Sequence, residues 1–185
     1  MNHYKKQCLI IVSFFLLFSF IDISSVFSQK QWKVQNSSIS FKIKNAGLTV
    51  DGKFGTAQAS IVFDAVNFEQ SSISASIEAK TIDTGIDSRD THLRKADYFD
   101  ATKYPQISMK SKKITKLANG TYEGFFDLML KGVTKEVKIP FSYTENNNTA
   151  TFEGSFTINR LDYGIGKSSW IMADNVTLKI TINVN

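Results

Sequence analysis

Residues 81–105, TIDTGIDSRDTHLRKADYFDATKYP, form the densest group of side chains in this sequence that could carry out chemistry. Five aspartates, four basic residues and His92 fall within this stretch. Carboxylate and imidazole groups serve in acid–base catalysis, in the activation of a nucleophile and in metal binding. Each of these uses requires further residues at a suitable spacing.

The catalytic interpretation lacks most of those further residues. Cys8 is the only cysteine and lies in the N-terminal segment, while His92 is the only histidine after residue 28. A Ser-His-Asp triad would therefore depend on His92, and the sequence contains no G-x-S-x-G elbow to supply its serine. An enzyme that acts on a lipid or quinone, with His92 and a nearby aspartate as acid and base, remains an alternative.

The metal interpretation meets a similar difficulty. The order D-x-x-x-D-x-x-D-x-H lacks the alternating ligands, central glycine and closing glutamate of a calcium-binding loop. One histidine is also few for a zinc or iron site. We therefore predict no metal and no other cofactor, although four residues were candidate ligands: Asp83, Asp87, Asp90 and His92.

A structural role accounts for more of these residues. Ser88 is a candidate N-cap, and Asp90 falls in the first turn of a short helix that runs to about Phe99. Such a helix would cover one end of the surrounding sheet structure with its apolar side. Because hydrogen-bonded polar networks are commoner than active sites, we assign four residues to a loop-and-helix plug: Asp83, Arg89, Asp90 and His92.

The segments on both sides of this plug alternate between apolar and polar residues, as half-buried β-strands do. The alternation is clearest in residues 39–43, 57–63, 73–79 and 137–143. Turn signals at Asp51-Gly52, at Asn119-Gly120 and in residues 145–148 favour hairpins, and so antiparallel pairing. We predict an all-β fold in which eight antiparallel strands form an up-and-down barrel, with a sandwich as the alternative.

The first 28 residues resemble a secretory signal peptide. Lys5 and Lys6 precede an apolar run from Cys8 to Phe20, and Val26 and Ser28 suit a cleavage site. We expect residues 1–28 to be removed and residues 29–185 to form one domain without disulfides. An uncleaved membrane anchor is the alternative.

The charge of the remaining chain is mildly basic. Residues 29–185 carry 20 basic and 16 acidic side chains, and many lysines alternate with apolar residues, as in residues 41–44. This pattern places the lysines on the solvent face of a sheet rather than in a nucleic-acid groove, so we predict no nucleic-acid partner. Such a face could also make a transient contact with anionic lipid headgroups.

Four motifs follow one another at the plug: Asp83-Thr84-Gly85, Arg89-Asp90-x-His92-Leu93, Asp97-x-Phe99-Asp100 and Tyr104-Pro105-x-Ile107. In these motifs the sequence resembles the YceI-like family of lipid or polyisoprenoid-binding proteins. The similarity continues through Val50-x-Gly52-x-Phe54, the segment 124–135 and Asn159-Arg160-x-Asp162-Tyr163-Gly164. Two positions depart from the family pattern: Asn45 stands where members often carry a histidine, and Met109 replaces an aromatic residue.

The resemblance implies a lipocalin-like barrel, exported to the periplasm or secreted, whose elongated apolar interior holds a polyisoprenoid or other long-chain amphiphilic lipid. It implies transport or storage of that lipid rather than catalysis. It also admits a homodimer, for which the sequence marks no surface. A filled barrel that serves only as an interaction module is a further alternative, because a barrel of this size is either just filled by side chains or holds one small ligand.

The candidate cavity residues are the large apolar side chains on one parity of each predicted strand. Arg89 and His92 are the candidate contacts to the polar end of a ligand. The predicted lining consists of Phe41, Ile43, Phe54, Ile61, Phe63, Ile77, Met109, Phe126, Leu128, Phe141, Phe156 and Leu178.

Overall fold

The computed structural model describes residues 29–185, so the predicted signal peptide lies outside the described residues. The described chain contains one α-helix, α1 (Asp87–Leu93), and three short 3-10 helices, η1 (Phe68–Gln70), η2 (Ala79–Thr81) and η3 (Arg160–Tyr163). Its ten strands are β1 (Gln31–Trp32), β2 (Val34–Asn45), β3 (Leu48–Phe54), β4 (Gln58–Val62), β5 (Ser72–Glu78), β6 (Gln106–Lys116), β7 (Tyr122–Leu130), β8 (Val133–Asn146), β9 (Thr149–Asn159) and β10 (Asn175–Val184).

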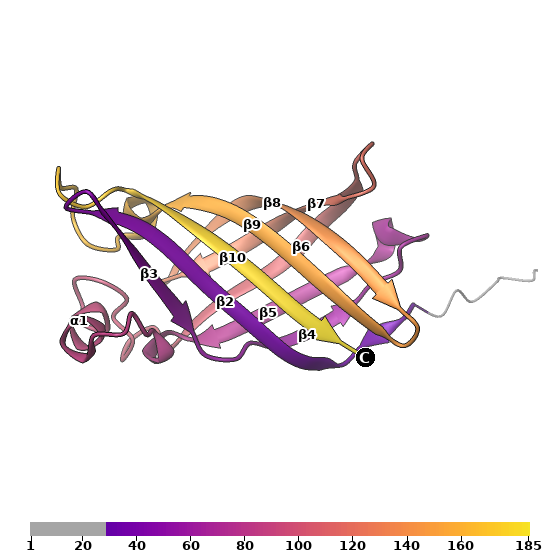
Figure 1. The fold of residues 1–185 in the computed structure, drawn as a ribbon, viewed down its shortest axis with the longest axis horizontal. Helices are drawn as coiled ribbons and strands as arrows, with labels where there is room; N and C mark the ends of the chain where they lie inside the picture. The colour runs from indigo at the N-terminus through magenta and orange to yellow at the C-terminus, as the bar shows by residue number, and fades with distance from the viewer. Residues whose placement is uncertain (1–28) are drawn as a thin grey trace, which may run out of the picture.

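All ten strands belong to one curled antiparallel sheet in the order β1-β4-β5-β6-β7-β8-β9-β10-β2-β3 (Figure 1). β1 pairs with β4, but the chain passes through Lys33 directly into β2, which pairs with β10. Two backbone hydrogen bonds between Lys33 and Asn185, 2.8 and 2.9 Å long, continue the pairing of β2 with β10 through this point. The predicted all-β antiparallel fold is confirmed, with ten strands rather than eight because the first is divided at Lys33 and β3 returns along β2.

The turn between β2 and β3 corrects one local prediction. The chain reverses at Ala46 and Gly47, both at positive φ, rather than at Asp51-Gly52. Gly52 instead lies within β3, opposite Phe41 of β2. A Cβ atom on Gly52 would lie only 2.2 Å from the Phe41 ring, so this position has no room for a side chain.

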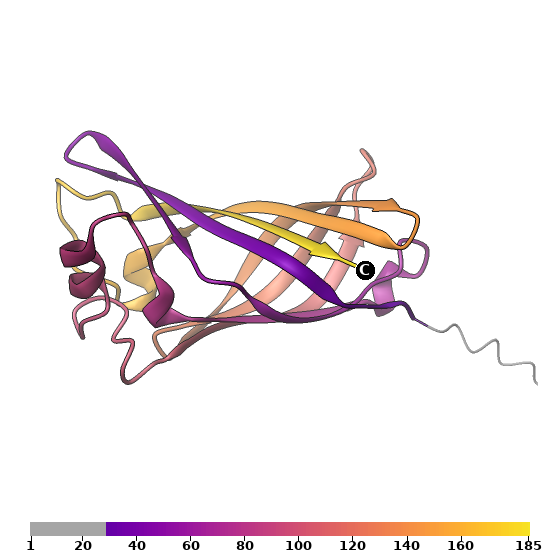
Figure 2. The same ribbon diagram turned by 60° about the horizontal axis from the view of Figure 1, so that its bottom comes forward.

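One end of the barrel-like sheet is filled by aromatic side chains. Phe63 is fully buried, with its ring centroid 5.1 Å from that of Tyr122 and 5.3 Å from that of Phe152. Trp32 packs into the same hydrophobic cluster and donates a 3.1 Å hydrogen bond from Nε1 to the Phe63 carbonyl. We call this the packed end. Figure 2 shows the strands wrapping around the common interior.

The plug, residues 81–105, lies at the opposite end of the sheet from the C-terminus (Figure 1). The predicted helix is present, but α1 begins at Asp87 and ends at Leu93, and no side chain caps its N-terminus. Turns held by backbone hydrogen bonds continue to Tyr104, so Phe99 lies in a turn rather than at the end of a helix. Within residues 29–185, no helix has the length and apolar character needed to cross a membrane.

Candidate ligand cavity

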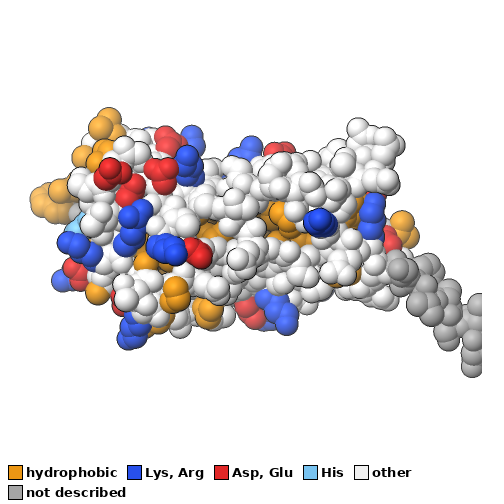
Figure 3. Space-filling view, turned by 90° about the horizontal axis from the view of Figure 1, so that it is seen from below, with side chains coloured by type: hydrophobic (Ala, Val, Ile, Leu, Met, Phe, Trp, Pro, Cys, Tyr) orange, Lys and Arg blue, Asp and Glu red, His pale blue; other side chains and the backbone are white. Residues whose placement is uncertain are grey.

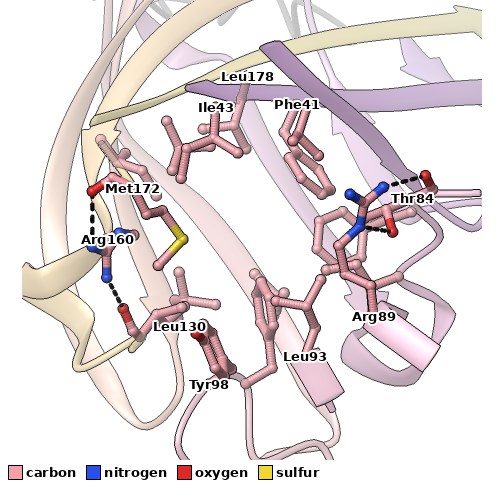
Figure 4. Close-up of a pocket in the computed structure, with 18 of the residues that line it drawn as sticks. Phe41, Ile43, Thr84, Arg89, Leu93, Tyr98, Leu130, Arg160, Met172 and Leu178 are labelled. Atoms are coloured by element: carbon pink, nitrogen blue, oxygen red, sulfur yellow. Dashed lines mark hydrogen bonds between the residues drawn. The ribbon is translucent and has the colours of Figure 1, made fainter. Parts of the chain in front are cut away.

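A cavity of about 140 Å³ lies between the plug and the interior of the sheet (Figure 4). Seven strands and the plug contribute apolar side chains to its wall. The polar contributions come from only four residues, Asn45, Thr84, Arg89 and Arg160. The apolar lining is Phe41, Ile43, Val50, Phe54, Ile77, Ile82, Leu93, Tyr98, Phe99, Ile107, Leu128, Leu130, Ile158, Ile165, Met172, Val176 and Leu178.

A second, smaller cavity of about 70 Å³ lies deeper in the sheet, lined by residues that include Met109, Phe156 and Ile180. Four side chains belong to the walls of both cavities, so they separate one from the other. We call them the waist: Ile77, Ile107, Leu128 and Leu178. The two cavities therefore adjoin along the interior of the sheet, at the waist.

Eight of the predicted lining residues face one of these cavities. Whether they contact a ligand stays a prediction. The larger cavity is lined by Phe41, Ile43, Phe54, Ile77, Leu128 and Leu178, and the smaller one by Met109 and Phe156 together with three of these.

The other four predicted lining residues, Ile61, Phe63, Phe126 and Phe141, lie in the hydrophobic cluster and line neither cavity. Their side chains do point into the interior, as the alternation predicted. What differs is their position along the barrel, because the aromatic rings of the packed end leave no space there. Alternation tells which face a side chain occupies but not how far along the sheet the interior stays open.

Arg160, which the sequence analysis noted only as part of a motif, is the most buried charged side chain at the cavity. It is 3% exposed and donates hydrogen bonds from Nε to the Ala173 carbonyl (2.9 Å) and from its terminal nitrogens to the carbonyls of Ile165 (2.8 Å) and Lys167 (2.9 Å). It also forms a 3.0 Å ion pair with Asp174. The guanidinium therefore holds the loop 164–174 against the sheet.

The plug is fastened by a second polar network. Asp90 is 4% exposed and accepts hydrogen bonds from the backbone nitrogen and the hydroxyl of Thr84, at 2.9 and 2.5 Å. Arg89 donates to the Thr84 hydroxyl and carbonyl at 2.7 and 2.8 Å. The predicted structural roles of Arg89 and Asp90 agree with these contacts, and Arg89 also lines the cavity (Figure 4).

Asp83 joins the plug to β3. Lys53 and Asp83 exchange two backbone hydrogen bonds of 2.8 and 2.9 Å, and their side chains lie 3.4 Å apart. The backbone N–H of Gly85 donates to the Asp83 carboxylate and, with the Lys53 ammonium, lowers the pKa of that carboxyl group. Asp83 thus acts at the outer side of the plug rather than in the cavity.

His92 is exposed, and its ring packs edge-on against Tyr98 with centroids 4.9 Å apart. Its imidazole makes no hydrogen bond to a carboxylate within residues 29–185, and it does not line the cavity. Across the same residues, no three His, Cys, Asp or Glu side chains are grouped to hold a metal ion. The geometry therefore offers an apolar binding space with a few polar groups at its rim.

The curled antiparallel sheet with its plug and apolar cavity defines a lipocalin-like class of protein. Residues 31–184 match the family model of the YceI-like domain, and the chain belongs to this family. A UPF0312 protein of Vibrio parahaemolyticus is 30% identical over 149 residues, which cover 75% of this chain and 79% of that protein.

Solved structures show the same fold. BcnA of Burkholderia cenocepacia superposes with a TM-score of 0.77 at 27% identity, covering 80% of this chain and 96% of that one. The YCEI protein of Campylobacter jejuni gives 0.68 at 25% identity, covering 74% and 85% of the two chains. A polyisoprenoid binding domain from Saccharophagus degradans gives 0.64 at 12% identity, covering 85% and 98%.

Proposed function

We propose that this protein binds a polyisoprenoid or another long-chain amphiphilic lipid in its cavity and serves in the transport or storage of that lipid. The observation that carries the proposal is a cavity whose wall is almost wholly apolar, beneath a plug that is fastened by partly buried polar contacts. The fold shared with a domain described as polyisoprenoid binding is the reason to choose isoprenoids as the first ligands to test.

The energetics favour an occupied cavity. An empty apolar space of about 140 Å³ costs roughly 3 kcal/mol at ~24 cal/mol per Å³. Apolar cavities of this size stay dry and take up small apolar molecules. Each methylene group of a ligand that is buried there contributes about 0.8 kcal/mol, so burial of about a dozen methylenes would offset an association cost in the range of about 4–15 kcal/mol.

A long chain would need more length than the larger cavity provides. We infer that its end passes the waist and occupies the second cavity, because Ile77, Ile107, Leu128 and Leu178 line both cavities. These are aliphatic side chains, which can change rotamer without breaking a hydrogen bond. The combined path runs from the plug toward the packed end, where the aromatic cluster stops it.

The polar end of the ligand is assigned to the rim beside Arg89. Its guanidinium carries five N–H donors, and the contacts to Thr84 use two of them. The remaining donors are available to a headgroup oxygen. His92 is the weaker candidate for this contact, because its ring faces Tyr98 outside the cavity wall.

The filled-barrel alternative fits only the packed end of the molecule, since two cavities occupy the rest of the interior. We further propose export to the periplasm or beyond, with removal of residues 1–28. N-terminal sequencing of the protein from its native host would test this: a chain that still begins at Met1 contradicts the proposed cleavage.

The binding proposal is tested by native mass spectrometry of protein purified from its own host, followed by solvent extraction and identification of the released molecules. We expect a stoichiometric long-chain lipid. The informative variant is Leu178→Trp, which fills the waist, and its matched control is Lys179→Trp on the exposed face of the same strand β10.

Leu178→Trp should lose most of the bound lipid or retain only a shorter one, whereas Lys179→Trp should keep the wild-type ligand. A wild-type protein that is empty and takes up no added isoprenoid would overturn the carrier proposal. Equal occupancy in the two variants would remove the waist from the ligand path.

A further inference from the structure

Of the large apolar side chains exposed at the plug end of the molecule, three lie on two neighbouring tips. Leu48 is 72%, Trp170 103% and Ile171 60% exposed. They occupy two tips, the turn between β2 and β3 and the loop 164–174, and we call them the mouth patch. Figure 3 shows apolar side chains protruding at this end of the molecule.

The two tips are bound to one another by backbone hydrogen bonds. Ala46 N–H donates to the Ile171 carbonyl at 2.7 Å, and Ala173 N–H donates to the Lys44 carbonyl at 2.8 Å. Arg160 braces the same loop from the buried side. The mouth patch is therefore presented by a braced pair of tips, not by a free loop.

The mouth patch is continuous with the cavity wall. Met172, the next residue after Ile171, lines the cavity, and so do Asn45 and Val50 on either side of the β2–β3 turn. A molecule that touches Leu48 and Trp170 is thus one or two residues away from the interior.

We propose that the mouth patch inserts into the interfacial layer of a lipid bilayer, so that the ligand passes between membrane and cavity without crossing water. This inference rests on the proposed lipid-binding function. It gives the exposed apolar residues a specific purpose, because exposed apolar groups at a binding site are a mark of a contact surface. A bilayer is also the place where a long-chain lipid is available.

Two observations favour a bilayer over a second protein molecule. The tips carry Lys44 and Lys167, and the one carboxylate in residues 44–50 and 164–174, that of Asp174, is already ion-paired with Arg160, which suits anionic headgroups. Tryptophan is also the side chain that prefers the membrane–water interface. In contrast, three side chains supply only a fraction of the ~800 Å² per partner that a stable protein interface buries.

The test uses protein purified from its native host and vesicles of phosphatidylethanolamine and phosphatidylglycerol. Flotation measures binding, and phosphatidylglycerol with brominated acyl chains measures contact, because bromine quenches a nearby tryptophan. The chain has two tryptophans, and Trp32 is buried, so contact quenching reports on Trp170. The variant is Leu48→Ser/Trp170→Ser/Ile171→Ser, and the matched control is Val66→Ser, which removes an apolar residue 82% exposed in the β4–β5 connection at the other end.

We expect the wild type and Val66→Ser to float with the vesicles, and the brominated lipid to quench the tryptophan fluorescence of the wild type. The affinity of the triple variant for vesicles should be lower than that of the wild type by a factor of about ten or more. The triple variant should still hold its lipid after purification but should exchange it with vesicles more slowly. That pattern separates membrane contact from ligand binding. If the wild type, the control and the triple variant all lacked bound lipid, the result would contradict the proposed lipid-binding function rather than the membrane contact.

Three results would overturn the inference. The first is wild-type protein that holds lipid but neither floats nor is quenched. The second is equal vesicle binding by the triple variant. The third is a change from dimer to monomer on substitution, seen by light scattering, with vesicle binding unaffected, which would assign the mouth patch to a second copy of the chain.

Discussion

At the scale of single residues, the sequence identified the polar residues of the plug better than it identified their functions. Asp90 and Arg89 are held by Thr84, as a structural network requires, and neither is directed at His92. The sequence analysis did not single out Arg160, because nothing in the local sequence indicates that its side chain is buried. Its five hydrogen-bond acceptors come from the loop 164–174, whose path no local pattern predicts.

Arg160→Lys should therefore be a costly substitution despite the conserved charge. A lysine ammonium has three donors on a flexible stem and cannot reproduce the fork that reaches several carbonyls at once. We expect a loss of about 2–4 kcal/mol in the free energy of unfolding, measured in urea, because buried acceptors lose their donors. Amide hydrogen exchange in residues 165–173 should increase.

The control for this substitution is Lys131→Ala. Lys131 donates one exposed 2.6 Å hydrogen bond to the Gly164 carbonyl at the start of the same loop, and we expect its loss to cost under about 1 kcal/mol. If Arg160→Lys and Lys131→Ala lower the free energy of unfolding equally within error, the guanidinium does not brace the loop.

At the scale of elements, strand identity was predictable and the ends of elements were not. Alternation located the strands because each has one face in the interior. The turn was misplaced at Asp51-Gly52 because a glycine that makes room for Phe41 looks, in the sequence, like a glycine that makes a turn. Ser88 was a plausible N-cap, but α1 begins at Asp87 with Ile86 at the N-cap position, and Asp90 turns its carboxylate to Thr84 instead.

Asp90→Ala tests whether α1 is fixed by that carboxylate. The change leaves the partly buried backbone N–H and hydroxyl of Thr84 without their acceptor, so we expect a loss of about 2–3 kcal/mol. Asp87→Ala is the matched control, since Asp87 is exposed in the first turn of the same helix and should cost about 0.5 kcal/mol.

Hydrogen exchange should place the effect of Asp90→Ala in residues 83–99, and chemical denaturation should give its size. A result in which Asp87→Ala costs as much as Asp90→Ala would mean that helix electrostatics, rather than the contact with Thr84, keep the plug in position.

At the scale of the whole molecule, the interior is divided into the packed end and the end that holds the two cavities, which we call the hollow end. Alternation did not predict this division. Inward-facing residues such as Phe63 and Phe41 obey the same pattern, yet the first packs against other rings and the second lines a cavity. The difference depends on which side chains meet across the interior from strands far apart in the sequence. Eight predicted lining residues face a cavity because they lie on the plug side of that division.

Because of this division, we expect the substitution of phenylalanine by alanine to lower the free energy of unfolding by different amounts at the two ends. Phe63→Ala removes a ring that is fully buried among Tyr122, Phe141 and Phe152, and should cost about 3–5 kcal/mol in the free energy of unfolding. Phe41→Ala removes a ring that already borders empty space, so fewer contacts disappear and about 1–3 kcal/mol should be lost. Both values refer to lipid-free protein.

Added lipid distinguishes the two ends further, because a ligand that binds only the folded state raises the free energy of unfolding by an amount that grows with the logarithm of its concentration relative to its Kd. The stabilisation by lipid should persist in Phe63→Ala, since the packed end lies beyond both cavities. It should change in Phe41→Ala, because this substitution enlarges the cavity that the Phe41 ring lines in the wild type. Equal costs of the two substitutions in lipid-free protein would indicate that the hollow end is packed as densely as the other. The binding space would then have to be sought elsewhere on the molecule.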